Sequence, residues 1–110
     1  MTVQDLVNEL HLTVFCGQEN LNREIQGGYT SDLLSDVMGF ATEGQLWITL
    51  QTHQNVLAIA MHKKLVAILL VNGNEPDSDM LASAKEAFFP ILGTTFPAFE
   101  ITGKAYRLLH

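Results

Sequence analysis

Seven consecutive apolar residues, Leu65-Val66-Ala67-Ile68-Leu69-Leu70-Val71, form the longest apolar run of the chain. The run has no polar alternation, which is typical of a strand buried on both faces of a sheet. Lys63-Lys64 precedes it, and the turn-forming cluster Asn72-Gly73-Asn74-Glu75-Pro76 follows it. Because such a strand needs cover on both sides, the run predicts a sheet that lies between two layers of helices.

After residue 45, strand patterns and helix patterns alternate along the chain. β-branched and aromatic runs mark the strands, and apolar residues at helical spacing mark the helices. The expected strands are residues 46–50, 65–71 and 90–93, and the expected helices are residues 55–62, 78–87 and 98–109. This alternation is typical of parallel strands joined by right-handed crossovers. The predicted fold class is α/β, a single three-layer domain with a mostly parallel sheet and helices on both faces.

The N-terminal part of the chain has shorter patterns. Apolar residues recur at helical spacing after Thr2, a good N-cap residue, and predict a helix over residues 3–10. Strands are expected at residues 12–16 and 24–30, and a short helix is expected over residues 32–38, ended by Gly39.

Composition excludes several classes of function. The chain has 110 residues, which fits one domain, and its formal net charge is -6. An acidic balance argues against nucleic acid and anionic membrane surfaces as partners. Only 16% of the residues are charged, against roughly 25% in a typical soluble domain. This scarcity of charge favours a surface that is used for self-association.

Cellular location follows from the single cysteine and from the N-terminus. Cys16 has no second cysteine to pair with, which favours a reducing compartment, and we interpret it as a small buried hydrophobe. Residues 1–5 lack the basic and apolar regions of a signal peptide. The longest apolar run is far shorter than the ~20 residues of a membrane span. We therefore expect a cytoplasmic protein.

Three polar segments follow predicted strands, and the carboxyl ends of parallel strands form the ligand-binding edge of open α/β sheets. The segments are Gln51-Thr52-His53-Gln54-Asn55, Asn72-Gly73-Asn74 and Thr94-Thr95. Two of them lead into helix N-termini, whose free amides favour an anion or a carbonyl oxygen. We expect a neutral edge without Lys or Arg. The candidate ligand-binding residues are Thr52, His53, Asn55, Asn72, Gly73 and Thr95. Ordinary turn and cap chemistry is the alternative explanation.

No catalytic or metal-binding constellation is recognisable in the sequence. The four histidines lack a second histidine or cysteine at metal-ligand spacing, so we expect no metal and no cofactor. Asp32 and Asp36 are one helical turn apart, and paired carboxylates can do acid–base work. Acids in the first turn of a helix more commonly stabilise its dipole. A small enzyme that uses Asp32, Asp36 and His53 is thus the least favoured hypothesis.

Four of the six phenylalanines, Phe88, Phe89, Phe96 and Phe99, lie within twelve positions. The favoured interpretation is that they fill the core between the last helices and the sheet. The alternative is an exposed apolar patch that becomes buried on dimerisation.

Four segments resemble, in order, the motifs of one known family. Residues 21–28 resemble its x-D-R-x-V strand entry, and residues 44–49 resemble its G-D-L-V-I-T strand. Residues 69–76 resemble its L-I-L-T-G-G-x-x-P segment, and residues 90–99 resemble its P-V-L-x-T-x-x-D-T-F close. Through the order and spacing of these motifs, the chain resembles a single DRTGG domain over residues 1–110.

The resemblance is to stand-alone members, to the N-terminal domain of HPr kinase/phosphorylase and to the DRTGG module of CBS-containing pyrophosphatases. It implies a non-catalytic regulatory or interaction module, a homodimer that binds a partner protein or a small ligand. A separate hypothesis is a sensor that binds an adenine nucleotide or a similar metabolite at the edge with His53 and Asn72. The kinase's phosphate-binding loop belongs to a different domain, and the chain has no G-x-x-x-x-G-K-[ST] motif, so kinase activity is not expected.

The chain departs from the motifs that give the family its name. Where relatives have Asp-Arg and Thr-Gly-Gly, this sequence has Thr52-His53 and Val71-Asn72-Gly73. Any binding role of those motifs in relatives is therefore in question here.

Overall fold

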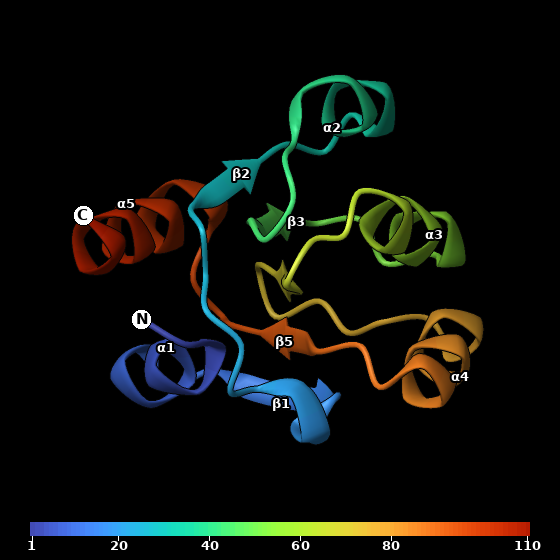
Figure 1. Cartoon of the computed structure of the whole chain (residues 1–110), viewed down its shortest axis with the longest axis horizontal. Helices are drawn as coiled ribbons and strands as arrows, with labels where there is room; N and C mark the ends of the chain where they lie inside the picture. The colour runs from blue at the N-terminus through green and yellow to red at the C-terminus, as the bar shows by residue number, and fades with distance from the viewer.

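The structure, a computed structural model, describes residues 1–110. Five strands form one sheet in the order β1-β5-β4-β3-β2 (Figure 1). The four parallel strands are β2 (Gly28–Thr30), β3 (Leu46–Thr49), β4 (Ala67–Leu70) and β5 (Ile91–Gly93). The edge strand β1 (Thr13–Cys16) runs antiparallel to β5. The predicted α/β class with a mostly parallel sheet is confirmed.

Helices cover both faces of the sheet and complete the three layers (Figure 1). One face carries α1 (Val3–Leu10) and α5 (Ala98–Leu109). The other face carries α2 (Leu34–Phe40), α3 (Gln54–His62) and α4 (Ser78–Ala87). None of these helices has the length and apolar character needed to cross a bilayer.

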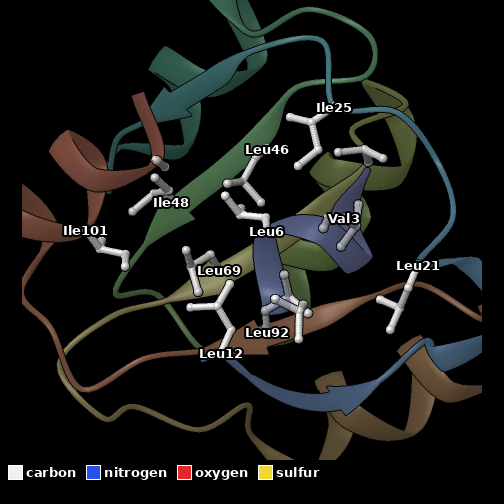
Figure 2. Packing of buried hydrophobic residues seen from close by; sticks show 14 of the residues in the cluster. Val3, Leu6, Leu12, Leu21, Ile25, Leu46, Ile48, Leu69, Leu92 and Ile101 are labelled. Atoms are coloured by element: carbon white, nitrogen blue, oxygen red, sulfur yellow. The ribbon is translucent and has the colours of Figure 1, made fainter. Parts of the chain in front are cut away.

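The core has two halves, one on each face of the sheet, and β4 contributes to both. Ala67 and Leu69 belong to the half under α1 and α5, whereas Ile68 and Leu70 belong to the half under α2, α3 and α4. Figure 2 shows Leu6 of α1 pointing toward the strand residues of the first half. Because successive side chains of a strand point to opposite faces, a strand covered on both faces is apolar throughout.

The second half of the core is centred on Trp47 of β3, which is fully buried. Its indole N–H donates a hydrogen bond of 2.9 Å to the carbonyl oxygen of Ser31. A buried indole needs such a partner, so this contact also fixes the segment between β2 and α2.

The N-terminal strand of the parallel set is shorter than the predicted strand 24–30. The N–H of Ile25 donates to the carbonyl of Met1, and the N–H of Val3 donates to the carbonyl of Arg23. The segment before Gly28 is thus bound to the N-terminal residues, which sequence patterns do not reveal. The helix predicted over residues 32–38 instead spans Leu34–Phe40, so Asp32 lies before it and Gly39 does not end it.

Gly17 follows β1 and has a left-handed backbone, with a φ of 83°. A Cβ atom at this position would lie 2.3 Å from the Cα atom of Pro90, so only glycine fits against this backbone. The side-chain amide of Asn20 donates a hydrogen bond of 2.8 Å to the carbonyl of Phe88 in the same region. The loop after β1 is therefore packed tightly on the segment that leads into β5.

Candidate functional site

The predicted binding segments lie together at the carboxyl edge, by which we mean the loops that follow strands β2 to β5. Two backbone hydrogen bonds join the loops after β4 and β5. The N–H of Asn72 donates to the carbonyl of Phe96 at 3.0 Å, and the N–H of Gly73 donates to the carbonyl of Thr94 at 2.9 Å. Asn72 and Gly73 are both in the left-handed region, with φ of 59° and 72°. The Asn-Gly pair is thus a turn that clamps the two loops together.

The loop after β3 is joined to the start of α4. The hydroxyl of Thr52 donates to the carboxylate of Asp77 at 3.1 Å, and the N–H of Asp77 donates to the carbonyl of Thr52 at 2.9 Å. Asp77 occupies the N-cap position of α4, but its side chain makes no capping bond to that helix. The carboxylate connects two loops instead.

The carboxyl edge is divided into two separate hollows. The Gly73 hollow, of about 440 Å³, is lined by Gly73, Asn74, Thr94 and Thr95 among others. The His53 hollow, of about 390 Å³, is lined by His53, Gln54, Asn55, Asp77 and Asp79. Of the six predicted ligand-binding residues, each hollow therefore receives two. Thr52 and Asn72 line neither of them.

The expectation of a neutral edge is wrong. Glu75 lines the Gly73 hollow, and Asp77 and Asp79 line the His53 hollow, while neither hollow contains Lys or Arg. The physical reason is that the turn after β4 carries these acids back to the edge as it enters α4. Carboxylates without a nearby cation repel anions. Both hollows thus suit a neutral or cationic hydrogen-bonding group better than a phosphate.

Asp32 and Asp36 do not form the carboxylate pair that their spacing predicted. Asp32 precedes α2, and its Oδ1 atom accepts hydrogen bonds of 2.8 Å from the hydroxyl of Thr49 and from the N–H of Leu50. Asp36 lies in α2 and accepts a hydrogen bond of 2.9 Å from the hydroxyl of Tyr29. Partial burial and the Asp36 carboxylate raise the pKa of Tyr29. Each acid therefore holds a separate part of the fold together.

Cys16 is buried, as the sequence predicted, and its thiol donates to the carbonyl of Phe89 at 3.3 Å. Burial raises the pKa of the Cys16 thiol, because a thiolate would lose its hydration there. This environment is that of a packing residue and not of a nucleophile. No group of three or more His, Cys, Asp and Glu side chains is arranged to hold a metal ion.

A larger hollow at the opposite end of the sheet was not predicted. The Arg23 hollow, of about 770 Å³, lies where the strands begin, and two cations, Arg23 and Lys64, line it. Met61 and Phe89 contribute apolar wall, and Glu24 and Glu43 contribute acids. The lining comes from segments that lie far apart in the sequence, so no local motif indicates it. The one local sign of this hollow in the sequence is the pair Lys63-Lys64, directly before the buried strand.

The interpretation of the aromatic cluster as core is wrong for three of its four members. Phe88, Phe96 and Phe99 are exposed, and only Phe89 packs against the buried core. Further large apolar side chains are exposed elsewhere, among them Phe40, with 72% of its surface accessible. The exposure of these rings agrees with the alternative, while their burial on dimerisation stays a prediction.

Family comparison matches this architecture to one known domain. A model of the DRTGG domain matches residues 5–108. The chain belongs to the DRTGG domain family. The match extends over almost the whole of this DRTGG domain, in agreement with the resemblance read from the sequence.

The fold is similar to that of solved structures. One of them is described as the crystal structure of the CBS and DRTGG domains of the regulatory region of Clostridium perfringens pyrophosphatase complexed with activator, diadenosine tetraphosphate. The TM-score is 0.71 and the sequence identity is 13%, over 93% of this DRTGG domain and 44% of that chain. At this identity the likeness concerns the fold, and our chain spans less than half of that structure. A search of curated proteins finds no match.

Proposed function

We propose that this DRTGG domain is a non-catalytic regulatory module that acts as a homodimer and binds a small ligand at its carboxyl edge. The observation that carries the proposal is the set of large apolar side chains left in solvent, of which Phe99 is the extreme case with 90% of its surface accessible. Exposed apolar side chains mark an interaction site where they lie together, as Phe99 and Tyr106 do, two helical turns apart on α5. The low proportion of charged residues, 16%, also favours self-association.

The polar groups of the carboxyl edge support a non-catalytic role. The carboxylates of Asp32 and Asp77 accept hydrogen bonds from the hydroxyls of Thr49 and Thr52. A general base must instead be free to reach a proton on a substrate. These two carboxylates connect loops. That role suits a regulatory module better than an enzyme, which would need them for proton transfer.

The small ligand is assigned to the carboxyl edge because backbone groups and side-chain donors converge there. Gly73 and Thr95 line one hollow, and His53 and Asn55 line the other. Thr52 and Asn72 fix the loops that shape these hollows. Since Glu75 lies in the Gly73 hollow, a neutral or cationic metabolite is the class that fits best.

The homodimer is tested by its mass in solution. Light scattering on the purified chain should give twice the monomer mass of 12.2 kDa at micromolar concentration. The mass should remain doubled at high salt, because burial of apolar surface is not screened by ions. A monomer mass at every concentration up to the millimolar range would contradict the homodimer.

A sensor of adenine nucleotide is the second candidate function. The observation that favours it is the Clostridium perfringens regulatory region, which is complexed with diadenosine tetraphosphate and shares this fold. In our chain the acids of the carboxyl edge disfavour phosphate, whereas in the Arg23 hollow two cations, Arg23 and Lys64, balance the two acids, Glu24 and Glu43. On charge, an anionic nucleotide fits the Arg23 hollow better.

Thermal shift with ADP, ATP and diadenosine tetraphosphate tests the sensor. A nucleotide at 100 times its Kd should stabilise the fold by about 2.7 kcal/mol. The double variant Arg23→Gln/Lys64→Gln should abolish that shift, and Thr95→Ala should leave it unchanged. Loss of the shift in Thr95→Ala alone would move the site to the carboxyl edge. The absence of stabilisation by any of the three at millimolar concentration would remove the sensor hypothesis.

A further inference from the structure

Beside the charged residues Glu100, Lys104 and Arg107, the outward face of α5 carries a stripe with two exposed rings that nothing in the monomer covers. Phe99, Gly103, Tyr106 and His110 follow one another at spacings of four, three and four residues, which places them on one face of a helix. Tyr106 is exposed over 65% of its surface, and Phe99 is still more exposed. The opposite face of the helix, with Ile101, is buried in the core. An isolated domain normally presents polar residues on the outer face of such a helix.

A small apolar cavity lies beside the C-terminal half of this stripe. It has a volume of about 110 Å³ and opens between α5 and β2, which lie side by side (Figure 1). Ile48 and Leu109 form apolar wall, and Tyr106 and His110, whose rings stack at 4.4 Å, stand beside it. A hydrogen bond of 2.9 Å between the hydroxyls of Thr30 on β2 and Thr102 on α5 holds the two elements in place.

The stripe thus has a projecting ring at one end and a cavity at the other. Phe99 lies four residues before Gly103, and Tyr106, next to the cavity, lies three residues after it. If two copies of α5 cross antiparallel at Gly103, a two-fold axis at this residue brings Phe99 of each copy opposite Tyr106 of the other. A two-fold interface requires this kind of self-complementarity, because one patch has to serve both subunits.

Two of the three charged residues on the outward face follow the same symmetry, whereas the third, Lys104, lies with its Nζ atom 5.0 Å from the centroid of the Phe96 ring. Glu100 lies three residues before Gly103, and Arg107 lies four residues after it, so the same axis places opposite charges face to face. Neither residue makes an ion pair within the monomer, where the single salt bridge joins the N-terminus to Glu24. Opposite charges at the rim of an interface fix its register.

Gly103 itself has no role in the monomer. A Cβ atom at this position would have no neighbour within 4 Å, so neither close packing nor a strained backbone requires glycine there. Glycine within a helix lowers its stability relative to alanine. Its benefit is that it lets another backbone approach closely, and Gly103 lies at the midpoint of the stripe.

We propose that two copies of this chain pack through α5, antiparallel around a two-fold axis at Gly103, with Phe99 of each copy in the cavity beside Tyr106 of the other. The inference rests on the homodimer of the proposed function and names its interface. The occupant of the stripe is therefore a second copy of the same chain.

Light scattering of surface variants tests the interface. Phe99→Asp and Gly103→Gln should each raise the dimer Kd by about 30-fold or more, as expected for residues at the centre of an interface. Gly103→Gln improves helix propensity at an open position, so its monomer should stay folded, as circular dichroism will verify. Phe40→Asp, a change of another exposed ring, on α2, is the matched control and should keep the dimer.

Cross-linking gives a positive signal for the same geometry. With Gly103→Cys, the two thiols meet at the axis within the about 7 Å between Cα atoms that a disulfide allows, so mild oxidation should yield a covalent dimer. Gly39→Cys, in the exposed part of α2, should stay monomeric on the same gel. Native Cys16 is buried and does not interfere.

The possible outcomes distinguish a failure of the α5 interface from a failure of the homodimer. A wild-type dimer that survives both Phe99→Asp and Gly103→Gln overturns the α5 interface and leaves the homodimer standing. A wild-type monomer overturns both. Charge reversal adds a check on register, because Glu100→Arg and Arg107→Glu should each weaken the dimer, and the two together should restore it.

Discussion

Replacement of Trp47 by alanine should lower the free energy of unfolding by about 3–5 kcal/mol, a large part of the roughly 5–15 kcal/mol that holds a typical domain together. Trp47 is fully buried in the half of the core formed with α2, α3 and α4. Its removal leaves a cavity whose lining loses contacts, since neighbouring side chains collapse only in part. It also deprives the carbonyl of Ser31 of its hydrogen-bond donor.

Urea unfolding followed by circular dichroism measures this loss. Fluorescence is unsuitable, because Trp47 is the single tryptophan of the chain. Trp47→Phe keeps an aromatic ring and removes the N–H, so it should lose less stability than Trp47→Ala. Phe40→Ala, at an exposed position, should change stability by less than about 0.5 kcal/mol. If Trp47→Ala and Phe40→Ala unfolded at the same urea concentration, the packing argument would be wrong.

Gly17→Ala should be nearly as damaging, with a loss of about 2–5 kcal/mol. A left-handed backbone costs an L-residue about 1–2 kcal/mol, and overpacking adds about 1–3 kcal/mol. At Gly17 both penalties apply, because φ is 83° and the new Cβ atom would lie 2.3 Å from the Cα atom of Pro90. A backbone atom cannot rotate away as the end of a side chain can.

Gly73→Ala is the matched control for Gly17→Ala. Gly73 has a φ of 72°, and a Cβ atom there would have no neighbour within 4 Å. The control therefore reports the conformational cost alone, and the difference between the two variants reports the clash with Pro90. Denaturant midpoints at equal slopes give both values. Equal losses in the two variants would show that the segment at Pro90 moves aside freely.

Elements that depend on local sequence could be predicted well. The helices Val3–Leu10 and Ala98–Leu109 have the predicted bounds, because apolar spacing and end signals set both. In α1, Thr2 and Asp5 form a capping box. The strand predicted at 24–30 failed for a non-local reason, because its first half bonds to the N-terminal residues. The antiparallel direction of β1 likewise depends on a partner, β5, that is distant in the sequence.

The position of the candidate site could be predicted, but its chemistry could not. Parallel strands bring their following loops to one edge whatever the side chains are. The hydrogen bonds accepted by Asp32 and Asp77 join residues that are 17 and 25 positions apart, so no local sequence pattern predicts them. The same applies to the Arg23 hollow, which several distant segments line. Exposure of Phe99 was an open alternative, because helical spacing alone does not say which face is covered.

Strands β2 to β5 lie side by side in the order in which a ribosome makes them, whereas β1 is made first and pairs with β5, the last. Thr13 of β1 cannot pair with its partner Gly93 of β5 until Gly93 has been synthesised. At about 5–20 residues per second this delay lasts several seconds, during which β1 offers unpaired backbone to any neighbour. The first strand of the nascent chain is therefore open to mispairing until β5 has been made, and we expect slower synthesis between β1 and β5 to lengthen that exposure.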